Sequence, residues 1–166
     1  MYTIHEKTTY NSILTLHEMM SRTLNKRRHI ILVIIGLIFC GWGVRCLILA
    51  KTSARIILSV LEFLFGLYYI FHVYIEAYFV WAKYKENPFE SCYEFNGDSF
   101  TYRQGSMKSS TDYSKISKLY RGGDAVFLVV DEHVVHYLDC CELDSGNTDE
   151  LCAFLQEKTG KEIGKA

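Results

Sequence analysis

The run HIILVIIGLIFCGWGVRCLILA, residues 29–50, decides the fold because nearly every side chain in it is apolar. A second apolar run follows at 56–82, after the short polar stretch 51–55. Each run is longer than the roughly 20 residues that a helix needs to cross a bilayer core. A cleaved signal peptide is disfavoured for the first run, because a long polar segment precedes it and a second run follows. The sequence therefore predicts two transmembrane helices joined by a short external loop.

Basic residues flank the two runs on the side of the chain termini. The segment 26–28 is Lys-Arg-Arg, and Lys83 and Lys85 follow the second run, whereas the loop carries Lys51 and Arg55. Loops rich in lysine and arginine stay on the cytoplasmic side of a membrane. We therefore expect a multi-pass protein of the cell membrane with both termini in the cytoplasm, where its cysteines would remain reduced.

Each apolar run contains a charged residue that needs an explanation, because a charge at membrane depth is costly. Arg45 in the first run and Glu62 in the second lie almost equally far from the middle of the loop. In an antiparallel helical hairpin they would meet, which predicts an intramembrane ion pair that fixes the hairpin register. The alternative is that each side chain reaches the membrane interface separately.

Polar residues also follow one face of the second run. At 100° per residue, Glu62, Tyr69, His72 and Glu76 fall within one narrow arc of a helix. The functional interpretation is a transport or catalytic activity inside the membrane, which would need an oligomer. The structural interpretation is that this stripe faces the first helix or a dimer partner.

Small residues in the first run would allow a second helix to approach closely, either within the chain or in a homo-oligomer. They are Gly36, Cys40, Gly41 and Gly43.

A linker at 83–91 containing Asn87-Pro88 leads into a β domain at 92–160. The stretch CYEFNGDSFTYR, residues 92–103, predicts a hairpin that turns at Asn96-Gly97. The apolar stretch AVFLVV at 125–130 predicts a central strand, and a turn at 131–133 leads into a strand at 134–139.

The last predicted element is a helix that starts at Asn147, has Glu150 in capping-box position and ends at Gly160. Residues 161–166 are expected to be a tail. The fold class is thus α+β, with a transmembrane hairpin and an antiparallel sheet closed by a C-terminal helix.

Four features of the β domain resemble a known family. They are Tyr-x-Phe at 93–95, Tyr-Ser-x-Ile at 113–116, the apolar strand, and Leu-x-x-Phe-Leu at 151–155. In this order they resemble the C-terminal domain of the YcxB-like family of small bacterial membrane proteins. The resemblance implies a fold like that of pleckstrin-homology domains, a bent sheet capped by a helix, with a paired membrane span before it.

The charge distribution separates the two halves of the chain. Residues 89–166 have a net charge of −6, and residues 1–88 have a net charge of +5. An acidic domain is repelled by nucleic acid and by anionic lipids, so nucleic acid is not an expected partner of the β domain. Lipid headgroup binding is the lesser alternative, through a local basic strip formed by Lys108, Lys115, Lys118 and Arg121. His133, His136, Cys140 and Cys141 match no standard zinc spacing, and the sequence has no nucleophile elbow or phosphate loop. We expect no metal, no cofactor and no enzymatic activity.

The N-terminal segment 1–28 has a loosely helical apolar face formed by Ile13, Leu14, Leu16, Met19, Met20 and Leu24. We expect a cytoplasmic helix that lies on the membrane or docks on the C-terminal domain. Taken together, the sequence favours a membrane-anchored cytoplasmic interaction module, such as an adaptor, a regulator or an immunity-type accessory. Its partner would be another membrane or cytoplasmic protein.

Overall fold

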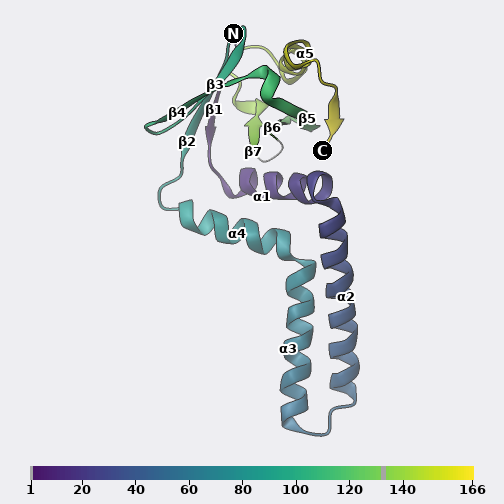
Figure 1. Ribbon diagram of the computed structural model, residues 1–166. Helices are drawn as coiled ribbons and strands as arrows, with labels where there is room; N and C mark the ends of the chain where they lie inside the picture. The colour runs from purple at the N-terminus through teal and green to yellow at the C-terminus, as the bar shows by residue number, and fades with distance from the viewer. Residues whose placement is uncertain (1, 132–133) are drawn as a thin grey trace. The chain divides into compact units, whose positions relative to one another are not determined.

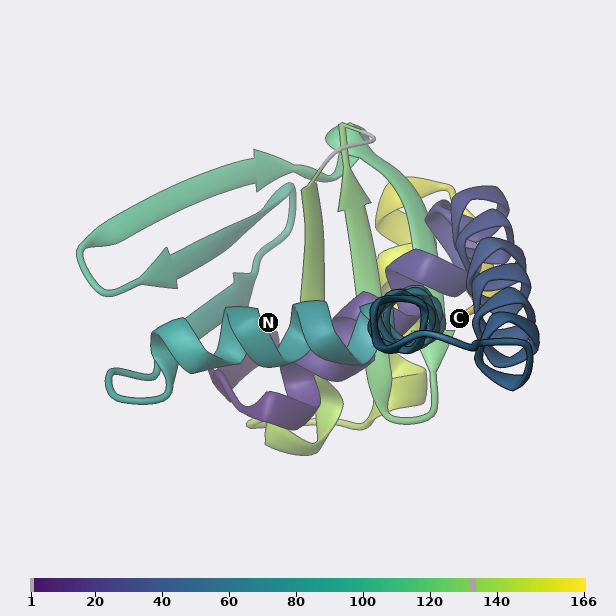
Figure 2. The ribbon, with the colours of Figure 1, turned by 90° about the horizontal axis from the view of Figure 1, so that it is seen from below.

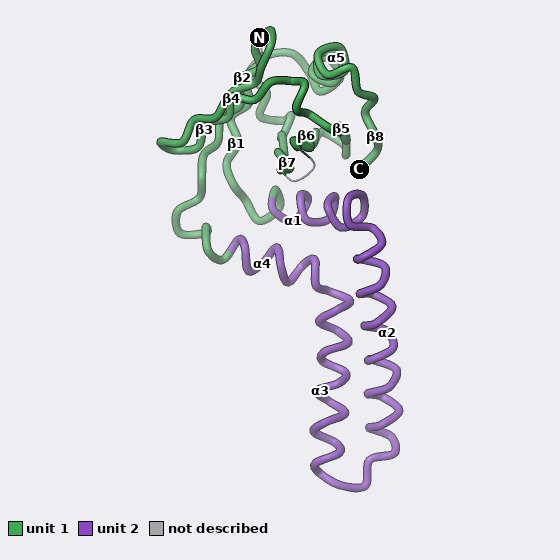
Figure 3. The backbone as a smooth tube through the Cα atoms, in the orientation of Figure 1, with its two compact units in different colours: residues 1–12, 82–166 green, residues 13–81 purple. Residues whose placement is uncertain are grey.

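The computed structural model describes residues 2–131 and 134–166, which form two compact units coloured separately in Figure 3. Residues 1–12 and 82–166 make up the β unit, and residues 13–81 make up the helical unit. The fold class is α+β, as predicted. Residues 132 and 133, which belong to the predicted turn at 131–133, lie outside the described residues.

The first sheet of the β unit has the order β1-β2-β3-β4 and is antiparallel throughout. Its strands are β1 (Tyr2–Lys7), β2 (Glu90–Phe95), β3 (Ser99–Gln104) and β4 (Met107–Asp112). The predicted hairpin joins β2 to β3, with Phe95 opposite Phe100 and the Asn96 N–H donating to the Ser99 carbonyl at 3.0 Å. The two central residues of the turn are therefore Gly97 and Asp98, one position later than the predicted Asn96-Gly97. In Figure 2 the β3–β4 hairpin reaches away from the second sheet.

The second sheet has the order β7-β6-β5-β8. Its strands are β5 (Ile116–Gly122), β6 (Ala125–Val130), β7 (Val134–Asp139) and β8 (Ile163–Lys165), and the 3₁₀ turns η2 (Tyr113–Lys115) and η3 (Cys140–Glu142) flank them. Every residue of β6 is buried, which confirms the predicted central strand. The prediction of a C-terminal tail is wrong for 163–165, because β8 pairs in parallel with β5.

The helix α5 (Thr148–Thr159) is capped at both ends as the sequence predicts. The Asn147 side chain accepts a hydrogen bond from the Glu150 N–H at 2.9 Å, and Gly160 ends the helix with a φ of 64°. Leu151 and Leu155 of α5 are fully buried in the same core as Phe95 and Phe100. The helix therefore closes the core that the two sheets enclose.

The N-terminal segment is partly a strand, so the prediction of a helix over 1–28 is wrong for β1. Tyr2 and Ile4 alternate with Thr3 and His5, which suits a strand with one buried face. Ile4 is fully buried in the core of the β unit. The N-terminal segment thus contacts the C-terminal domain as a sheet strand, and it supplies the partner that the edge of β2 would otherwise lack.

The helical unit contains the long helices α2 (Lys26–Ile48) and α3 (Ser53–Ile70), with a π-helical turn η1 (Met20–Leu24) before α2. Both long helices are apolar and long enough to cross a membrane. Their large apolar side chains are mostly exposed, up to 78 % at Ile48. In Figure 1, α1 (Tyr10–Met19) and α4 (His72–Tyr84) run across the direction of α2 and α3.

The second apolar run was predicted as one helix over 56–82, and this prediction is wrong. The helix ends at Ile70, Phe71 leaves helical geometry, and α4 begins at His72. His72 Nδ1 donates to the Tyr69 carbonyl at 2.8 Å, so an imidazole satisfies a carbonyl at the end of α3. No proline or glycine marks this position, so hydropathy and helix-breaking residues do not reveal the break.

Small residues allow α2 and α3 to pack closely, as the sequence predicts. A methyl group on Gly66 would lie 2.7 Å from the Gly36 carbonyl oxygen, and one on Gly43 would lie 2.9 Å from the Ser59 carbonyl oxygen. The Cys40 thiol lies 3.8 Å from the Phe63 carbonyl oxygen in the same contact. Gly41 faces open space and takes no part.

Candidate functional site

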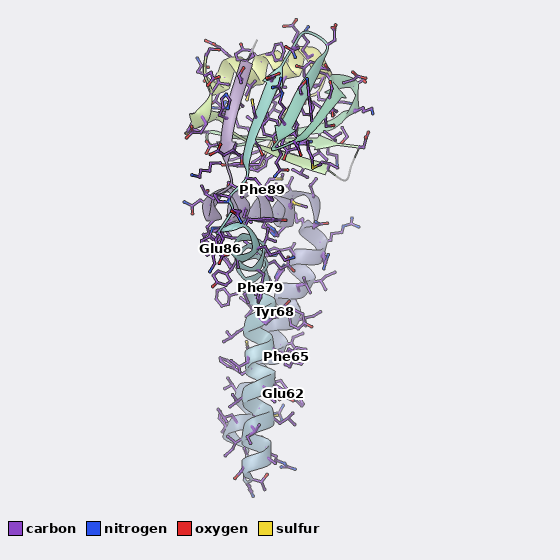
Figure 4. The ribbon with its side chains drawn as sticks, turned by 90° about the vertical axis from the view of Figure 1, so that its left-hand side faces the viewer. Glu62, Phe65, Tyr68, Phe79, Glu86 and Phe89 are labelled. Atoms are coloured by element: carbon purple, nitrogen blue, oxygen red, sulfur yellow. The ribbon has the colours of Figure 1, made fainter. Side chains whose placement is uncertain are left out.

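The predicted ion pair between Arg45 and Glu62 is absent among the described residues. Arg45 is exposed, and its guanidinium lies over the Trp42 ring at 5.8 Å, whereas Glu62 Oε2 is buried without a hydrogen-bond partner. Gly43 contacts α3, and a residue two positions further along a helix points about 200° away from it. Arg45 therefore faces away from α3. Figure 4 shows Glu62 on α3, together with Phe65 and Tyr68.

The predicted polar stripe is divided by the break at Phe71. Glu62 and Tyr69 belong to α3, while His72 and Glu76 belong to α4. His72 is 7 % exposed, and Glu76 is exposed. The structure brings these last two residues together with others that the stripe did not include.

His72 and Glu76 line a cavity of about 200 Å³ within the helical unit, which we call the histidine pocket. Its other lining residues are His17, Met20, Ser21, Asn25, Arg28, His29 and Val73. They come from the end of α1, the π-helical turn, the first turn of α2 and the first turn of α4. Three histidines and an arginine therefore converge on one small cavity.

Two ring nitrogens in the histidine pocket have no hydrogen-bond partner among the described residues. The rings of His29 and His72 lie 5.2 Å apart between centroids. His29 Nδ1 is buried without a partner, and His72 uses Nδ1 for the Tyr69 carbonyl, which leaves its Nε2 free. Burial lowers the pKa of His17, while the nearby Glu76 carboxylate acts in the opposite direction. The pocket is thus rich in hydrogen-bonding groups.

A larger cavity of about 740 Å³ lies in the β unit, and we call it the carboxylate pocket. It is lined by His5, Glu6, Lys7, Thr9, Ser12, Glu90, Ser91, Cys92, Arg103, Gly105, Asp139 and Glu142. Four of these residues are acidic. Arg103 already pairs with Glu94 at 3.0 Å, and His5 lies 3.7 Å from Asp144. Lys7, the remaining basic residue of the lining, has no ion pair among the described residues. The pocket carries excess negative charge.

Glu6 is the most perturbed acid in this pocket. Burial raises the pKa of its carboxyl to about 8, and the Asp139 carboxylate acts in the same direction. Glu6 lies on the same strand face as Ile4, which enters the core, so the strand itself carries the carboxyl into a poorly solvated position. A carboxyl with such a pKa releases its proton when a cation approaches.

Aromatic side chains beside the carboxylate pocket link the two sheets. The rings of Tyr93, Tyr102 and His136 lie within 5.7 Å of one another between centroids, and the Tyr93 hydroxyl is 3.4 Å from His136 Nδ1. Burial lowers the pKa of His136 and raises the pKa of Tyr93. These rings therefore pack together across the two sheets, with His136 and Tyr93 held in their neutral forms.

The residues considered for metal binding are dispersed. His136 belongs to the aromatic cluster, Cys140 is buried, Cys141 is exposed, and His133 lies outside the described residues. All six cysteines are free thiols, and burial raises the pKa of Cys140 to about 12. Within 2–131 and 134–166, no group of three or more His, Cys, Asp or Glu side chains has the arrangement of a metal site.

Sequence reasoning found His72 and Glu76 but missed His17, His29 and Glu6. A spacing signal existed only for Glu6, which follows Ile4 by two positions in an alternating strand. His17 and His29 reach the pocket because the π-helical turn redirects the chain between α1 and α2. No protein-family model matches the chain, and no curated protein matches it.

Proposed function

We propose that this protein is a membrane-anchored interaction module whose carboxylate pocket binds a basic segment of a partner protein. The observation that carries the proposal is a pocket of about 740 Å³ lined by four carboxyl groups. The lining also has three basic residues, and two of them, His5 and Arg103, already pair with acidic residues outside the lining. Lysine and arginine side chains complement such a lining. The role is recognition, and it needs no catalytic residue.

Membrane anchoring is supported by the surface of the helical unit. Most apolar side chains of α2 and α3 are exposed. In water such a surface would need a cover, and lipid or another apolar surface would provide it. Exposed aromatic residues of α4, among them Tyr74, Tyr78 and Phe79, suit the interface between headgroups and hydrocarbon. We propose that α2 and α3 form a transmembrane hairpin and that α4 lies at the interface.

The pairing of β1 with β2 supports an even number of membrane crossings. β1 precedes both long helices and β2 follows them, yet they are hydrogen-bonded neighbours in one sheet. Two strands of one sheet must lie in the same compartment. With the basic flanks of the helices, this favours both termini in the cytoplasm.

The two sheets and the C-terminal helix also agree with the fold that the YcxB-like resemblance implies. In that proposal the β unit is a pleckstrin-homology-like domain whose first strand is supplied from before the membrane hairpin. The two membrane helices would then be inserted in the sequence of the domain, between its first strand β1 and its second strand β2.

A peptide-binding measurement tests the proposal on the purified full-length chain in detergent. We expect a lysine- and arginine-rich peptide to bind and a glutamate-rich peptide of equal length not to bind. The double variant Glu90→Gln/Glu142→Gln should weaken binding about tenfold, because each exposed carboxylate contributes up to about 1 kcal/mol. The control Glu157→Gln/Glu162→Gln removes the same charge from exposed positions outside the pocket.

Equal losses of peptide affinity in the two double variants would mean that net charge alone explains the effect. That result would contradict binding at the carboxylate pocket. Affinity purification from native membranes with the same pair of variants then identifies the partner. A truncation that removes the β domain is a poor control, because it would leave β1 without its neighbour β2.

Topology is tested with a variant that keeps only Cys141, which is exposed, and replaces the other cysteines with serine. A membrane-impermeant maleimide should label Cys141 only after the cells are opened. Thr52→Cys, in the connection between α2 and α3, should be labelled in intact cells. Labelling of Cys141 in intact cells would refute the cytoplasmic placement.

A further inference from the structure

The first sheet of the β unit has one covered edge and one open edge. At the β1 edge, the Asp144 N–H donates to the Thr3 carbonyl at 3.0 Å, and Ile4 forms a bridge with Leu143. At the other edge, β4 pairs with β3 alone within the described residues, and in Figure 2 β4 is the outermost strand of the hairpin that reaches away from the second sheet. Because β4 has six residues and no proline, a further strand can be added to it.

The pairing register shows which backbone groups face the open edge. In an antiparallel sheet, the N–H and C=O groups of successive residues point alternately to the two sides of the strand. The Ser99 carbonyl accepts a hydrogen bond from Asn96 at the end of β2, so Ser99 faces β2. Phe100 therefore faces β4, and its partner Thr111 faces β3. Alternation along β4 then directs the backbone groups of three residues to the open edge: Lys108, Ser110 and Asp112.

The side chains of β4 carry opposite charges near its two ends. Lys108 and Asp112 are exposed, lie on the same face of the strand, and form no ion pair within 2–131 and 134–166. The residue opposite Lys108 in β3 is Arg103, which is basic and already pairs with Glu94. An added strand with an acidic residue opposite Lys108 and a basic residue opposite Asp112 would complement both charges.

We propose that β4 pairs with β4 of a second copy of this chain, antiparallel and with Ser110 on the two-fold axis. In this register Ser110 faces Ser110 of the second copy, and Lys108 faces Asp112 of the second copy. The symmetry produces the Lys–Asp pair twice. All three residues direct their backbone groups outward, so each facing pair can exchange two hydrogen bonds.

Other registers fit less well. With Ser109 on the axis, Lys108 would face Ser110 of the second copy, and both charge pairs would be lost. A register in which facing residues differ by one further position would oppose outward groups to inward groups. No residue of β4 lines the carboxylate pocket, so the proposal is independent of peptide binding there.

Charge reversal tests the proposal on the purified full-length chain in detergent, with self-association measured by analytical ultracentrifugation over a range of concentrations. Lys108→Glu places acidic groups opposite Asp112, and Asp112→Lys places basic groups opposite Lys108. Each variant should lower the association constant about tenfold, because like charges face each other twice. An equimolar mixture of the two variants should restore association, since each variant supplies the charges that the other lacks.

A matched variant separates this effect from net charge. Lys161 is exposed and lies between α5 and β8, outside every strand. Lys161→Glu changes the net charge by as much as Lys108→Glu does, and it should leave the association constant unchanged. Circular dichroism checks that each variant keeps its fold.

A cysteine crosslink tests the register without relying on charge. The six native cysteines are replaced by serine, and copper phenanthroline is the oxidant. Ser110→Cys should then form a disulfide-linked dimer, because facing residues of a hydrogen-bonded pair lie about 5.5 Å apart between Cα atoms. Met107→Cys is the control, since Met107 is 70 % exposed but would lie about 20 Å along the strands from Met107 of the second copy.

Each outcome supports or overturns the proposal. Restored association in the mixture, together with a crosslink at position 110, supports it. A chain that stays monomeric at every concentration would overturn it and would leave the edge of β4 to an extended segment of another protein. Equal changes in Lys108→Glu and Lys161→Glu would also overturn it, because the copies would then associate through another surface.

Discussion

The carboxylate pocket and the histidine pocket differ in how the chain builds them. The carboxylate pocket is assembled from strands that are neighbours in a sheet but distant in sequence, since β1 brings Glu6 beside β2. The histidine pocket is assembled where helices end, at the π-helical turn and at the break after Ile70. Strand pairing therefore brings acidic side chains together in the β unit. Interruptions of the helices bring three histidines and an arginine together in the helical unit.

The largest expected effect concerns the pairing of β1 with the β unit. Ile4→Ala should lower the free energy of unfolding of this unit by about 2–5 kcal/mol, because Ile4 is fully buried in its core. Hydrogen exchange of the β2 amides in the full-length chain measures the change. The control Ile48→Ala removes the same atoms from a site that is 78 % exposed and should leave this exchange unaltered. Unchanged exchange in Ile4→Ala would show that β1 does not stabilise the sheet.

The second prediction concerns the contact between α2 and α3. Gly66→Leu should destabilise this contact by about 1–3 kcal/mol, because even its Cβ would lie 2.5 Å from the Cys40 thiol and 2.7 Å from the Gly36 carbonyl oxygen. Gly41→Leu is the control, since nothing lies within 4 Å of a Cβ there. Thermal unfolding in detergent measures both. Similar midpoints for the two variants would contradict the close helix packing.

The smallest expected effect is a pH dependence of the β unit that the helical unit should not share. The Glu6 carboxyl has a pKa of about 8 in the folded chain, against an ordinary value of 4.5. Between these values the unfolded chain releases the proton first, so the free energy of unfolding falls as pH rises from 4.5 to 8 and then levels off. Because the carboxyl retains some contact with solvent, we expect Glu6→Gln to recover about 1 kcal/mol above pH 8.

Chemical unfolding of the wild-type chain and of Glu6→Gln across this pH range measures the difference. Glu86→Gln, at an exposed position in the segment of the chain that joins α4 to β2, serves as the control. A wild-type curve as flat as that of Glu6→Gln would mean that the carboxyl is well solvated.

Local patterns in the sequence predicted the elements whose stability is local. The hairpin between β2 and β3, the buried strand β6 and the capped helix α5 were all visible, because turn residues, continuous apolar stretches and capping pairs act within a few positions. Predictions that required a partner across space were less successful. Arg45 and Glu62 are at similar depths, but the contact face set by Gly36 and Gly43 turns Arg45 away.

Hydropathy and charge are sums over neighbouring residues, so they were enough to predict two long apolar helices and an acidic β domain. They could not predict that β1 joins that domain, that the second run breaks at Phe71, or that Glu6 and the three histidines line cavities. These outcomes depend on which backbone and side-chain groups find partners, and partners such as β2 for β1 or the Tyr69 carbonyl for His72 are set by spatial proximity. The physical reason is that hydrogen bonding and burial act through space, while composition and periodicity are read along the chain.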